Sequence, residues 1–412
     1  MRAVSALTIR KQIAPQLTTI GAMCDQFGGE VQTGPFGSQL HASDYSEYGI
    51  PVVMPQDLVD GGISPKNIAT VDESHAIRLS QHKLRSGDVV FSRRGDVSRF
   101  AVVTAPEEGW LCGTGCIRIR LNCSEIDTGY LRHFLRQDQV GAWLLHHAKG
   151  VTMPNLNTEI IRSIPFSYPP LDKQRRIAAI LDKADALRRK RKRAIELVDG
   201  LCESLFLELF GDPATNPKRL KLGRIGDLLD GVQYGTSAKA GGIGRYPILR
   251  MGNITIDGKM DFDDLKYIDL TENEVEKFTV KKGDILFNRT NSAELVGKTG
   301  VFDRDEPFAY AGYLVRARTK DGVSPEYISG YLNSAHGKAT LRGMAKSIIG
   351  MANINAKELQ SIPILIPDGP SQRKYAELLS VISRRRMQYT DNFKYLDDLF
   401  SSVQSRAFSG QL

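Results

Sequence analysis

The sequence predicts a mixed α/β protein made of two tandem copies of one unit, each an α/β domain followed by a long helix. Three observations predict this architecture: motifs that recur at a nearly constant spacing, two long segments without proline, and strand-like runs between clusters of Gly, Asn and Pro. The length of 412 residues agrees, because it exceeds what a single hydrophobic core usually serves.

The duplication rests on collinear matches between the two halves. Gly87–Arg93 (Gly-Asp-Val-Val-Phe-Ser-Arg) recurs 196 residues later as Gly283–Arg289 (Gly-Asp-Ile-Leu-Phe-Asn-Arg), and Met153–Asn157 recurs 198 residues later as Met351–Asn355. The other matches are Ser163-Ile164-Pro165 with Ser361-Ile362-Pro363, Gln174-Arg175 with Gln372-Arg373, and Gln32 with Gln233. Five matches in the same order indicate an internal repeat.

Each copy ends in a segment that predicts a long helix. The first follows Pro169-Pro170, with Asp172 as the expected N-cap, and stops at Gly211; the second follows Pro370, with Ser371 as the expected N-cap. Each would be ~60 Å long if fully helical.

Both segments carry an apolar stripe with alternating spacings of four and three, which neither helix could bury alone. The first stripe contains Ile177, Leu181, Ala184, Arg188, Arg191, Ile195, Val198, Cys202, Leu205 and Leu209. The second contains Tyr375, Leu379, Ile382, Arg386, Tyr389, Phe393, Leu396, Phe400, Val403 and Ala407. We therefore expect the two helices to pack on each other as a coiled coil. The basic run 188–193 points around most of such a helix, which favours a solvated surface.

The segments before the helices predict short strands, such as 88–92 and 284–288, and helical stretches at 128–146 and 325–342. The predicted parts are a first domain (1–168), a central helix (169–211), a second domain (212–366) and a C-terminal helix (367–412). The order of strands within the domains does not follow from the sequence.

Composition narrows the class of protein. Lys and Arg number 55 against 47 Asp and Glu, a net charge of +8, which favours a polyanionic partner such as nucleic acid. The five scattered cysteines predict neither a disulfide framework nor a zinc site. Without a membrane-length apolar run or a signal-peptide pattern over residues 1–17, we expect a cytoplasmic protein with no membrane contact.

The sequence offers no recognisable catalytic motif. Gly297-Lys298-Thr299 looks like the end of a phosphate-binding loop, but Ser292 stands where that loop needs Gly. His146 and His147 would point to different faces of a helix, and the seven histidines show no metal-ligand spacing. We expect no catalytic residue and no metal.

Gly87–Arg94 followed by Gly95, and Ile164-Pro165 leading through Pro169-Pro170-Leu171 to Gln174–Ile177, occur in order and in two copies. In these motifs the sequence resembles the specificity (S) subunit of type I restriction-modification systems, over essentially the whole chain. The resemblance implies that 1–168 and 212–366 are target recognition domains, each reading one half of a split DNA site. It also implies that the two helices are antiparallel and form a conserved stem between the domains.

The resemblance implies double-stranded DNA, two methyltransferase (M) subunits and two restriction (R) subunits as partners. S-adenosylmethionine, ATP and magnesium would belong to those partners, so the chain itself would need no cofactor. Two copies with antiparallel helices would be related by an approximate two-fold axis, as a DNA duplex is. Because the domains differ more than the helices do, we expect a non-palindromic, two-part target.

Three alternatives stay open at this point. The chain could serve a related system that cuts beside its site. It could be a self-sufficient methyltransferase or nuclease, which would bind S-adenosylmethionine by itself. It could also be a duplicated coiled-coil scaffold, which would show no sequence preference on DNA.

The candidate DNA contacts are basic or amide side chains at strand ends, together with two Gly-rich loops (32–38 and 233–237). Arg93, Arg94, Arg289 and Asn291 follow strand-like runs where the chain turns. The full expected set is Gln32, Thr33, Gly34, Phe36, Ser38, Arg93, Arg94, Arg99, Gln233, Tyr234, Thr236, Arg250, Asn253, Arg289, Asn291 and Lys298. Asn155 and Asn353 are expected to be turn or cap residues instead.

Overall fold

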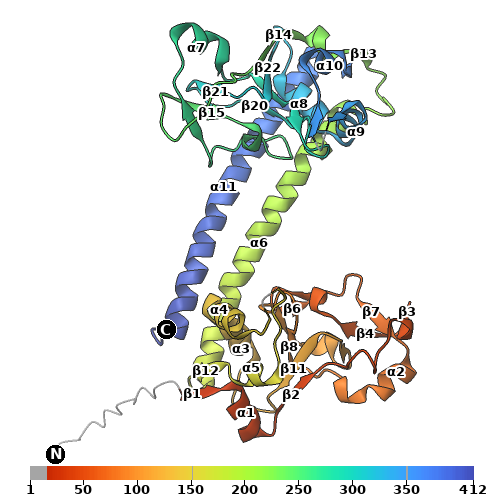
Figure 1. Cartoon of the computed structure of the whole chain (residues 1–412), viewed down its shortest axis with the longest axis vertical. Helices are drawn as coiled ribbons and strands as arrows, with labels where there is room; N and C mark the ends of the chain where they lie inside the picture. Colours follow the sequence, from red (N-terminus) through yellow and green to blue (C-terminus); the bar gives the residue numbers. More distant parts are fainter. Residues whose placement is uncertain (1–15, 151, 349–350) are drawn as a thin grey trace, which may run out of the picture. The chain divides into compact units, whose positions relative to one another are not determined.

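The structure is a computed structural model that describes residues 16–150, 152–348 and 351–412. Its internal packing separates two compact units, residues 1–190 with 393–412 and residues 191–392. Each unit therefore contains one α/β domain and one half of each long helix, and each is described by itself (Figure 1). The four-part division at the helix ends remains a prediction.

The first unit contains two four-stranded sheets. Its elements are β1 (Gln16–Thr19), α1 (Ile20–Phe27), β2 (Glu30–Thr33), β3 (Tyr45–Ser46), β4 (Ile50–Val53), β5 (Leu58–Val59), β6 (Gly62–Ile63), β7 (Ala69–Val71), α2 (Glu73–Arg78), β8 (Val89–Ser92), β9 (Phe100–Val102), β10 (Leu111–Cys112), β11 (Cys116–Arg120), α3 (Thr128–Leu135), α4 (Asp138–His147), α5 (Thr158–Arg162), β12 (Pro165–Tyr168) and α6 (Leu171–Phe210). One sheet has the order β2-β11-β8-β9 and the other β10-β4-β7-β3, while β1 pairs with β12.

The second unit repeats this plan. Its elements are β13 (Lys221–Arg224), β14 (Leu229–Tyr234), β15 (Tyr246–Leu249), β16 (Lys266–Ile268), α7 (Glu272–Phe278), β17 (Thr279–Val280), β18 (Ile285–Asn288), β19 (Thr290–Asn291), β20 (Thr299–Val301), β21 (Phe308–Tyr310), β22 (Leu314–Thr319), α8 (Pro325–Asn333), α9 (Ala335–Met344), β23 (Lys346–Ile348), β24 (Met351–Asn353), α10 (Ala356–Ser361), β25 (Pro363–Ile366) and α11 (Gly369–Phe408). The sheet β14-β22-β18-β20 matches β2-β11-β8-β9, and β13-β25 matches β1-β12.

The repeated Gly-Asp motif leads into a strand that is buried on both faces. In β8, Val89 and Phe91 pack against the helices of the first unit, whereas Val90 packs against the second sheet. All four residues of β18 are likewise buried. Successive side chains of a strand point to opposite faces, so a continuous apolar run fits a strand between two cores. The predicted strands at 88–92 and 284–288 are confirmed.

The two helical stretches predicted within the domains are confirmed, and each consists of two helices. The segment 128–146 forms α3 and α4, which are separated at Arg136-Gln137, and 325–342 forms α8 and α9, which are separated at Ser334. The Ser334 hydroxyl accepts a hydrogen bond from the Gly337 backbone N–H, because Ser334 is the N-cap of α9.

The two long helices have the predicted extent, but their first turns differ from the prediction. Each has 40 residues, and α6 ends just before Gly211, whose φ of 80° suits glycine. The helix α11 begins at Gly369, and the Asp368 carboxylate accepts a hydrogen bond from the Ser371 N–H at 2.7 Å. Asp368, not Ser371, therefore caps α11. Asp172 lies inside the first turn of α6, where its negative charge interacts favourably with the helix dipole.

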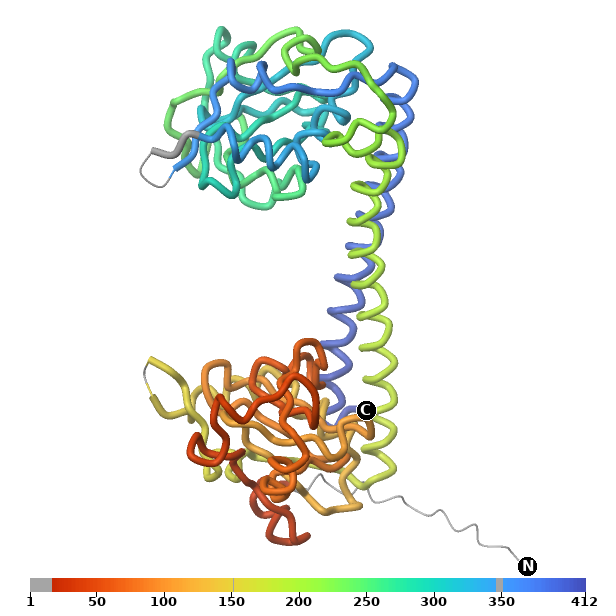
Figure 2. The backbone as a smooth tube through the Cα atoms, turned by 90° about the vertical axis from the view of Figure 1, so that its right-hand side faces the viewer, coloured from red at the N-terminus to blue at the C-terminus, as the bar shows by residue number. Residues whose placement is uncertain are grey.

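The apolar stripes of α6 and α11 face each other, as the spacing predicted. All ten positions of each stripe are buried or half-buried. Phe400 and Ala407 pack with Ile177 and Leu181 in the first unit, whereas Phe206 and Phe210 pack with Tyr375 in the second. The start of one helix thus lies beside the end of the other, and the pairing is antiparallel (Figure 2).

Ion pairs between the long helices recur with the roles of the helices exchanged. In the first unit Arg188 of α6 pairs with Asp397 of α11 at 2.7 Å. In the second unit Arg386 of α11 pairs with Asp199 of α6 at 2.6 Å. Both arginines and both aspartates lie 198 residues apart, so the repeated sequence makes the same contact twice. Such reciprocity is the mark of an isologous pairing.

The repeated glutamine attaches each long helix to its domain. The buried Gln174 side chain accepts from the Asp127 N–H at 2.9 Å and donates to the carbonyl oxygen of Pro169 at 2.8 Å. Gln372 likewise accepts from the Ser324 N–H at 3.0 Å and donates to the Pro367 oxygen at 2.9 Å. Since Asp127 and Ser324 are the N-caps of α3 and α8, each amide joins two helix starts.

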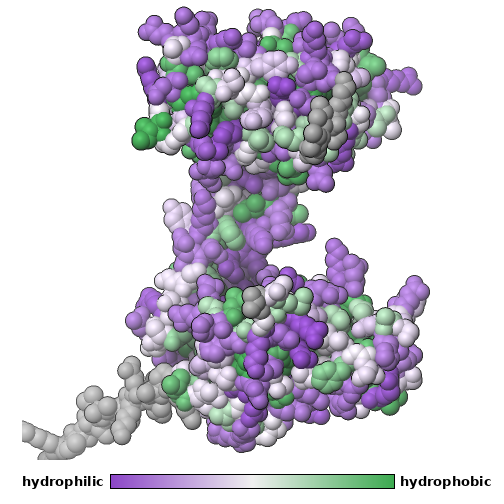
Figure 3. All heavy atoms as spheres, viewed as in Figure 1, coloured by the Kyte–Doolittle hydropathy of each residue, from purple (hydrophilic) through white to green (hydrophobic). Residues whose placement is uncertain are grey.

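One face of the chain is shown by residue hydropathy in Figure 3. Hydrophilic residues dominate both units on the face that Figure 3 displays. Among the described residues, no helix combines the length and the apolar character that crossing a bilayer requires.

Candidate nucleic-acid interface

The two repeated arginines occupy the same place in both domains. Arg93 follows β8; its N–H donates to the Gly115 oxygen at 2.7 Å, and its carbonyl oxygen accepts from the Leu156 N–H at 2.9 Å. Arg289 follows β18 and makes the same pair of bonds, donating to the Tyr313 oxygen at 3.0 Å and accepting from the Ile354 N–H at 2.9 Å. The backbone that presents each arginine is therefore fixed on both sides.

Each of these arginines lies over an exposed aromatic ring. The Arg93 Cζ atom is 6.0 Å from the centroid of the Phe36 ring, and the Arg289 Cζ atom is 4.8 Å from that of Tyr234. A guanidinium over a ring is attracted by the ring quadrupole and keeps its N–H groups available. In each domain the structure thus brings together two of the expected DNA contacts, an arginine and an aromatic residue that are far apart in sequence.

The Gly-rich loops need glycine at one equivalent position. The N–H of Gly34 donates to the Cys116 oxygen at 2.9 Å, and that of Gly235 to the Leu314 oxygen at 3.2 Å. A Cβ atom on Gly34 would lie 2.0 Å from the Gly113 oxygen, and one on Gly235 would lie 2.3 Å from the Ala311 oxygen. Relative to this glycine the two rings differ in position, because Tyr234 precedes it and Phe36 comes two residues after it.

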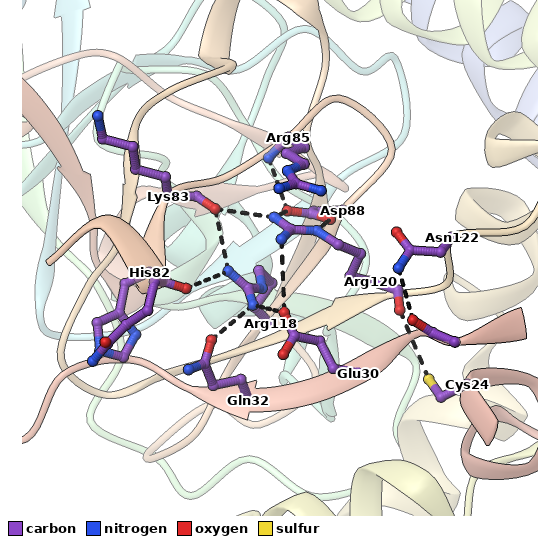
Figure 4. A network of polar contacts seen from close by, with 12 residues as sticks. Cys24, Glu30, Gln32, His82, Lys83, Arg85, Asp88, Arg118, Arg120 and Asn122 are labelled. Carbon is purple, nitrogen blue, oxygen red and sulfur yellow. Dashed lines mark hydrogen bonds and ion pairs between the residues drawn. The ribbon is translucent and has the colours of Figure 1, made fainter.

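A buried arginine lies beneath the first loop, and the sequence analysis missed it. The Arg118 guanidinium bonds to the carbonyl oxygens of Gln81 and Lys83, to the Glu30 carboxylate and, at 2.7 Å, to the Gln32 Oε1 atom (Figure 4). Burial lowers the pKa of Arg118 from its usual value. Gln32 therefore has a structural partner within the domain, which fixes the strand that enters the loop.

In both domains the aspartate of the Gly-Asp motif forms an ion pair with an arginine of a neighbouring strand, β11 or β22. Asp88 contacts Arg120 at 2.6 Å in the first domain (Figure 4). Asp284 contacts Arg318 at 2.9 Å in the second domain. The hydrogen bond to the carboxylate raises the pKa of both arginines. Arg-Ile-Arg at 118–120 recurs as Arg-Ala-Arg at 316–318, 198 residues later, so this repeat was visible in the sequence.

Asn253 and Lys298, two expected contacts, are engaged with the protein itself. Asn253 is 3% exposed; it accepts from the Arg250 N–H at 2.8 Å and donates to the Asp261 and Asp264 oxygens. The Lys298 ammonium donates to the backbone oxygens of Met251, at 3.0 Å, and Ile254, and burial lowers its pKa. Both residues therefore help to hold the 250–254 turn.

Arg250 borders a surface cleft in the second domain. Its guanidinium pairs with Asp264 at 2.9 Å, and the cleft of about 360 Å³ is also lined by Tyr313. Tyr313 is exposed and adjoins Arg289 through the backbone bond described above. Tyr313 was not among the expected residues, because an isolated tyrosine carries no motif signal.

The other expected residues occupy loops or strand ends. Arg94 and Ser38 are exposed, and Asn291 is half-exposed in β19. Arg99 pairs with Asp96 at 3.0 Å. The remaining three are Thr33 at the end of β2, Gln233 in β14, which donates to the Tyr234 oxygen, and the buried Thr236, whose hydroxyl accepts from the Ala238 N–H.

Two other expectations concern asparagines and metal ligands. The N-caps of α5 and α10 are Asn157 and Asn355, not Asn155 and Asn353. Asn155 and Asn353 pair by backbone beside the repeated arginines instead. In the parts of the chain that the structure describes, no group of three or more His, Cys, Asp or Glu side chains could hold a metal ion.

These features define a class of protein: a duplicated recognition protein in which one framework carries two surface sites that share an arginine and differ in the loops around it. Comparison with known families is decisive at this point. The family described as the type I restriction modification DNA specificity domain matches twice, over residues 31–197 and 220–392. The chain belongs to this family, and it contains two copies of the DNA specificity domain.

Individual relatives agree with this assignment. The type I restriction enzyme EcoKI specificity subunit of Escherichia coli (strain K12) is 25% identical over 309 residues, 70% of this chain and 66% of that protein. This chain thus matches just under two thirds of that relative's length. The crystal structure of the type I restriction-modification S subunit from M. genitalium gives a TM-score of 0.57 at 14% identity, over 97% of this chain and 98% of that one. A chain from a study of complex assembly in the type I R-M system gives a TM-score of 0.56 at 20% identity and a similar coverage. The fold is therefore that of S subunits.

Proposed function

We propose that this chain is the DNA-reading subunit of a type I restriction-modification complex in the cytoplasm and binds a two-part, non-palindromic target. The observation that carries the proposal is the divergence of the surface loops on a repeated framework. Seven residues, 93–99, connect β8 to β9, whereas ten residues, 289–298, connect β18 to β20. Two domains with one framework and different loops suit two different half-sites.

The proposal assigns catalysis to partner subunits. M subunits would bind S-adenosylmethionine and methylate adenine, and R subunits would use ATP and magnesium. This chain would supply positioning, because the two repeated arginines and the loops after them offer groups that bind DNA. A self-sufficient methyltransferase would be indicated if the isolated chain bound S-adenosylmethionine in calorimetry.

Each unit carries a matching apolar pair on its long helices, which supports two copies of one partner. Leu197 and Leu201 of α6 are exposed in the second unit, and Tyr395 and Leu399 of α11 are exposed in the first. The two pairs lie 198 residues apart, and their exposed fractions range from 50% to 74%. Residues four apart share one helix face, and an exposed apolar face marks a site of protein contact. We infer that one M subunit docks on each pair.

The experiment for this partner surface is pull-down of M by the full chain. Replacing Leu197 and Leu201 by Glu should reduce the bound M from two copies to one, and also replacing Tyr395 and Leu399 by Glu should abolish binding. Lys192 and Glu196 are exposed polar residues of the same helix. Replacing both by Ala is the matched control and should leave two copies of M bound. Two bound copies in the four-fold variant would refute this docking site.

The experiment for the function is to co-express the chain with its M subunit and to sequence the methylated adenines. We expect one motif with two defined parts and a fixed gap. A continuous motif would contradict the proposal. So would a formed complex that methylates without sequence preference, the result expected of a scaffold.

A further inference from the structure

Both domains carry the same arginine, Arg93 or Arg289, although the two domains are proposed to read different half-sites. They occupy the same position after the same strand, and the same two backbone bonds hold them. The residues that follow differ: Arg94 stands where the second domain has Thr290. A contact that both domains make with the same residue cannot distinguish two unlike half-sites.

The stacked ring is present in both domains although it comes from different positions. In the second domain it is Tyr234, at the end of β14, and its hydroxyl accepts from the Ala356 N–H at 3.0 Å. In the first domain it is Phe36, in the loop beyond Gly34. The guanidinium thus has an aromatic support in each case, which restricts its orientation before any ligand binds.

Both guanidinium groups keep an uncompensated positive charge. Among the described residues neither Arg93 nor Arg289 forms an ion pair, whereas the neighbouring Arg99 pairs with Asp96. The Nε atom of each repeated arginine is buried without a hydrogen-bond partner. Both side chains are half-exposed, and an unpaired guanidinium matches an anion with two oxygens.

We propose that Arg93 and Arg289 each bind a phosphate of the DNA backbone at equivalent places in the two half-sites, and that the divergent loops after them read the bases. The inference rests on the proposed function and refines it. Phosphate is the group that every half-site shares, and phosphate contacts fix register and orientation while base contacts specify sequence. The loops 94–99 and 290–298 would then be placed against the bases by the arginine that precedes each of them.

The test compares DNA binding by the complex of the full chain with its M subunit, using three duplexes. One contains the methylated motif, one has an altered second half-site, and one is unrelated. Arg289→Ala should weaken binding to all three by the same factor, about tenfold for a lost charge-assisted contact. The slope of log affinity against log salt should fall by about one, and the methylated motif should stay the same.

Arg94→Ala is the matched control, because Arg94 is exposed and the second domain has no arginine at the equivalent position. It should change the first half of the methylated motif and spare the second half. Arg289→Gln, which keeps a long polar side chain, is measured in parallel. The melting curves of both Arg289 variants show whether either one has a folding defect. Neutral methylphosphonate at the phosphate that Arg289 contacts should weaken binding by the wild-type complex but should have no further effect on binding by Arg289→Gln.

A changed second half of the motif in Arg289→Gln would overturn the inference, because it would show base contact. Unchanged DNA affinity with loss of M assembly would also overturn it, because it would show a protein contact. Failure of the proposed function looks different: the wild-type complex would yield no two-part motif. The phosphate contact would then still be tested by the salt dependence of binding to unrelated DNA, compared between the wild-type complex and Arg289→Ala.

Discussion

Gln372→Leu tests the attachment of a long helix to its domain. The Gln372 side chain is 3% exposed and joins the Ser324 N–H to the Pro367 carbonyl oxygen. Leucine has a similar size but leaves both backbone groups buried and unpaired, at about 1–3 kcal/mol each. We expect the free energy of unfolding of the second unit to fall by about 2–5 kcal/mol. Gln174→Leu should cost the first unit at least as much, because Gln174 also donates to the Glu125 oxygen.

Urea unfolding of the full chain measures both variants. The two tryptophans, Trp110 and Trp143, lie in the first unit, so their fluorescence reports on that unit, whereas circular dichroism reports on the helices of both. Gln174→Leu should shift the fluorescence transition, and Gln372→Leu should shift circular dichroism alone. Gln404→Leu, which removes one half-buried bond to the His133 oxygen, is the control and should cost under about 1 kcal/mol. A change below about 0.5 kcal/mol for Gln372→Leu would refute the structural role of the repeated glutamine.

Three further predictions follow from single contacts. Gly235→Ala places a Cβ atom 2.3 Å from a backbone oxygen and should destabilise the second unit by about 2–4 kcal/mol in urea unfolding; a neutral result would contradict the close approach. Arg118→Met should destabilise the first unit by about 1–3 kcal/mol, because it removes the hydrogen bonds that the buried guanidinium makes to the Gln81 and Lys83 oxygens, and wild-type stability would show that these bonds are dispensable. His133 is fully buried, and burial lowers its pKa despite the 2.7 Å contact with Asp182. Since the unfolded chain then takes up the proton first, the first unit should lose stability as pH falls below about 6.5. His133→Gln should flatten that pH dependence, and an unchanged slope would assign it to other groups.

The repeat and the long helices could be predicted because their signals are local. A stripe with spacings of three and four needs only the sequence, and the proline and glycine breaks mark its ends. The antiparallel direction of the pairing was implied by the resemblance, and the reciprocal ion pairs were seen only in the structure. The first turn of α11 was misplaced by three residues, because Asp368 and Ser371 are both good caps and only the structure shows which one accepts the bond.

The candidate site was harder to predict, because polar residues close turns as readily as they bind ligands. Asn253 and Lys298 have the chemistry of DNA contacts, but both satisfy backbone groups of one turn. Strand pairing over long sequence distances placed Phe36 against Arg93 and put Arg118 beneath Gln32. Those pairings are non-local, and no spacing in the sequence reveals them.

The most direct test of the central claim is to replace the second recognition domain, residues 212–366, by a second copy of residues 16–168 and to map the methylated adenines made with the M subunit. If each domain reads one half-site and the long helices pair antiparallel, the target should become symmetric, with the first half-site present twice in inverted orientation. An unchanged asymmetric motif, or a motif that keeps the original second half, would contradict the account.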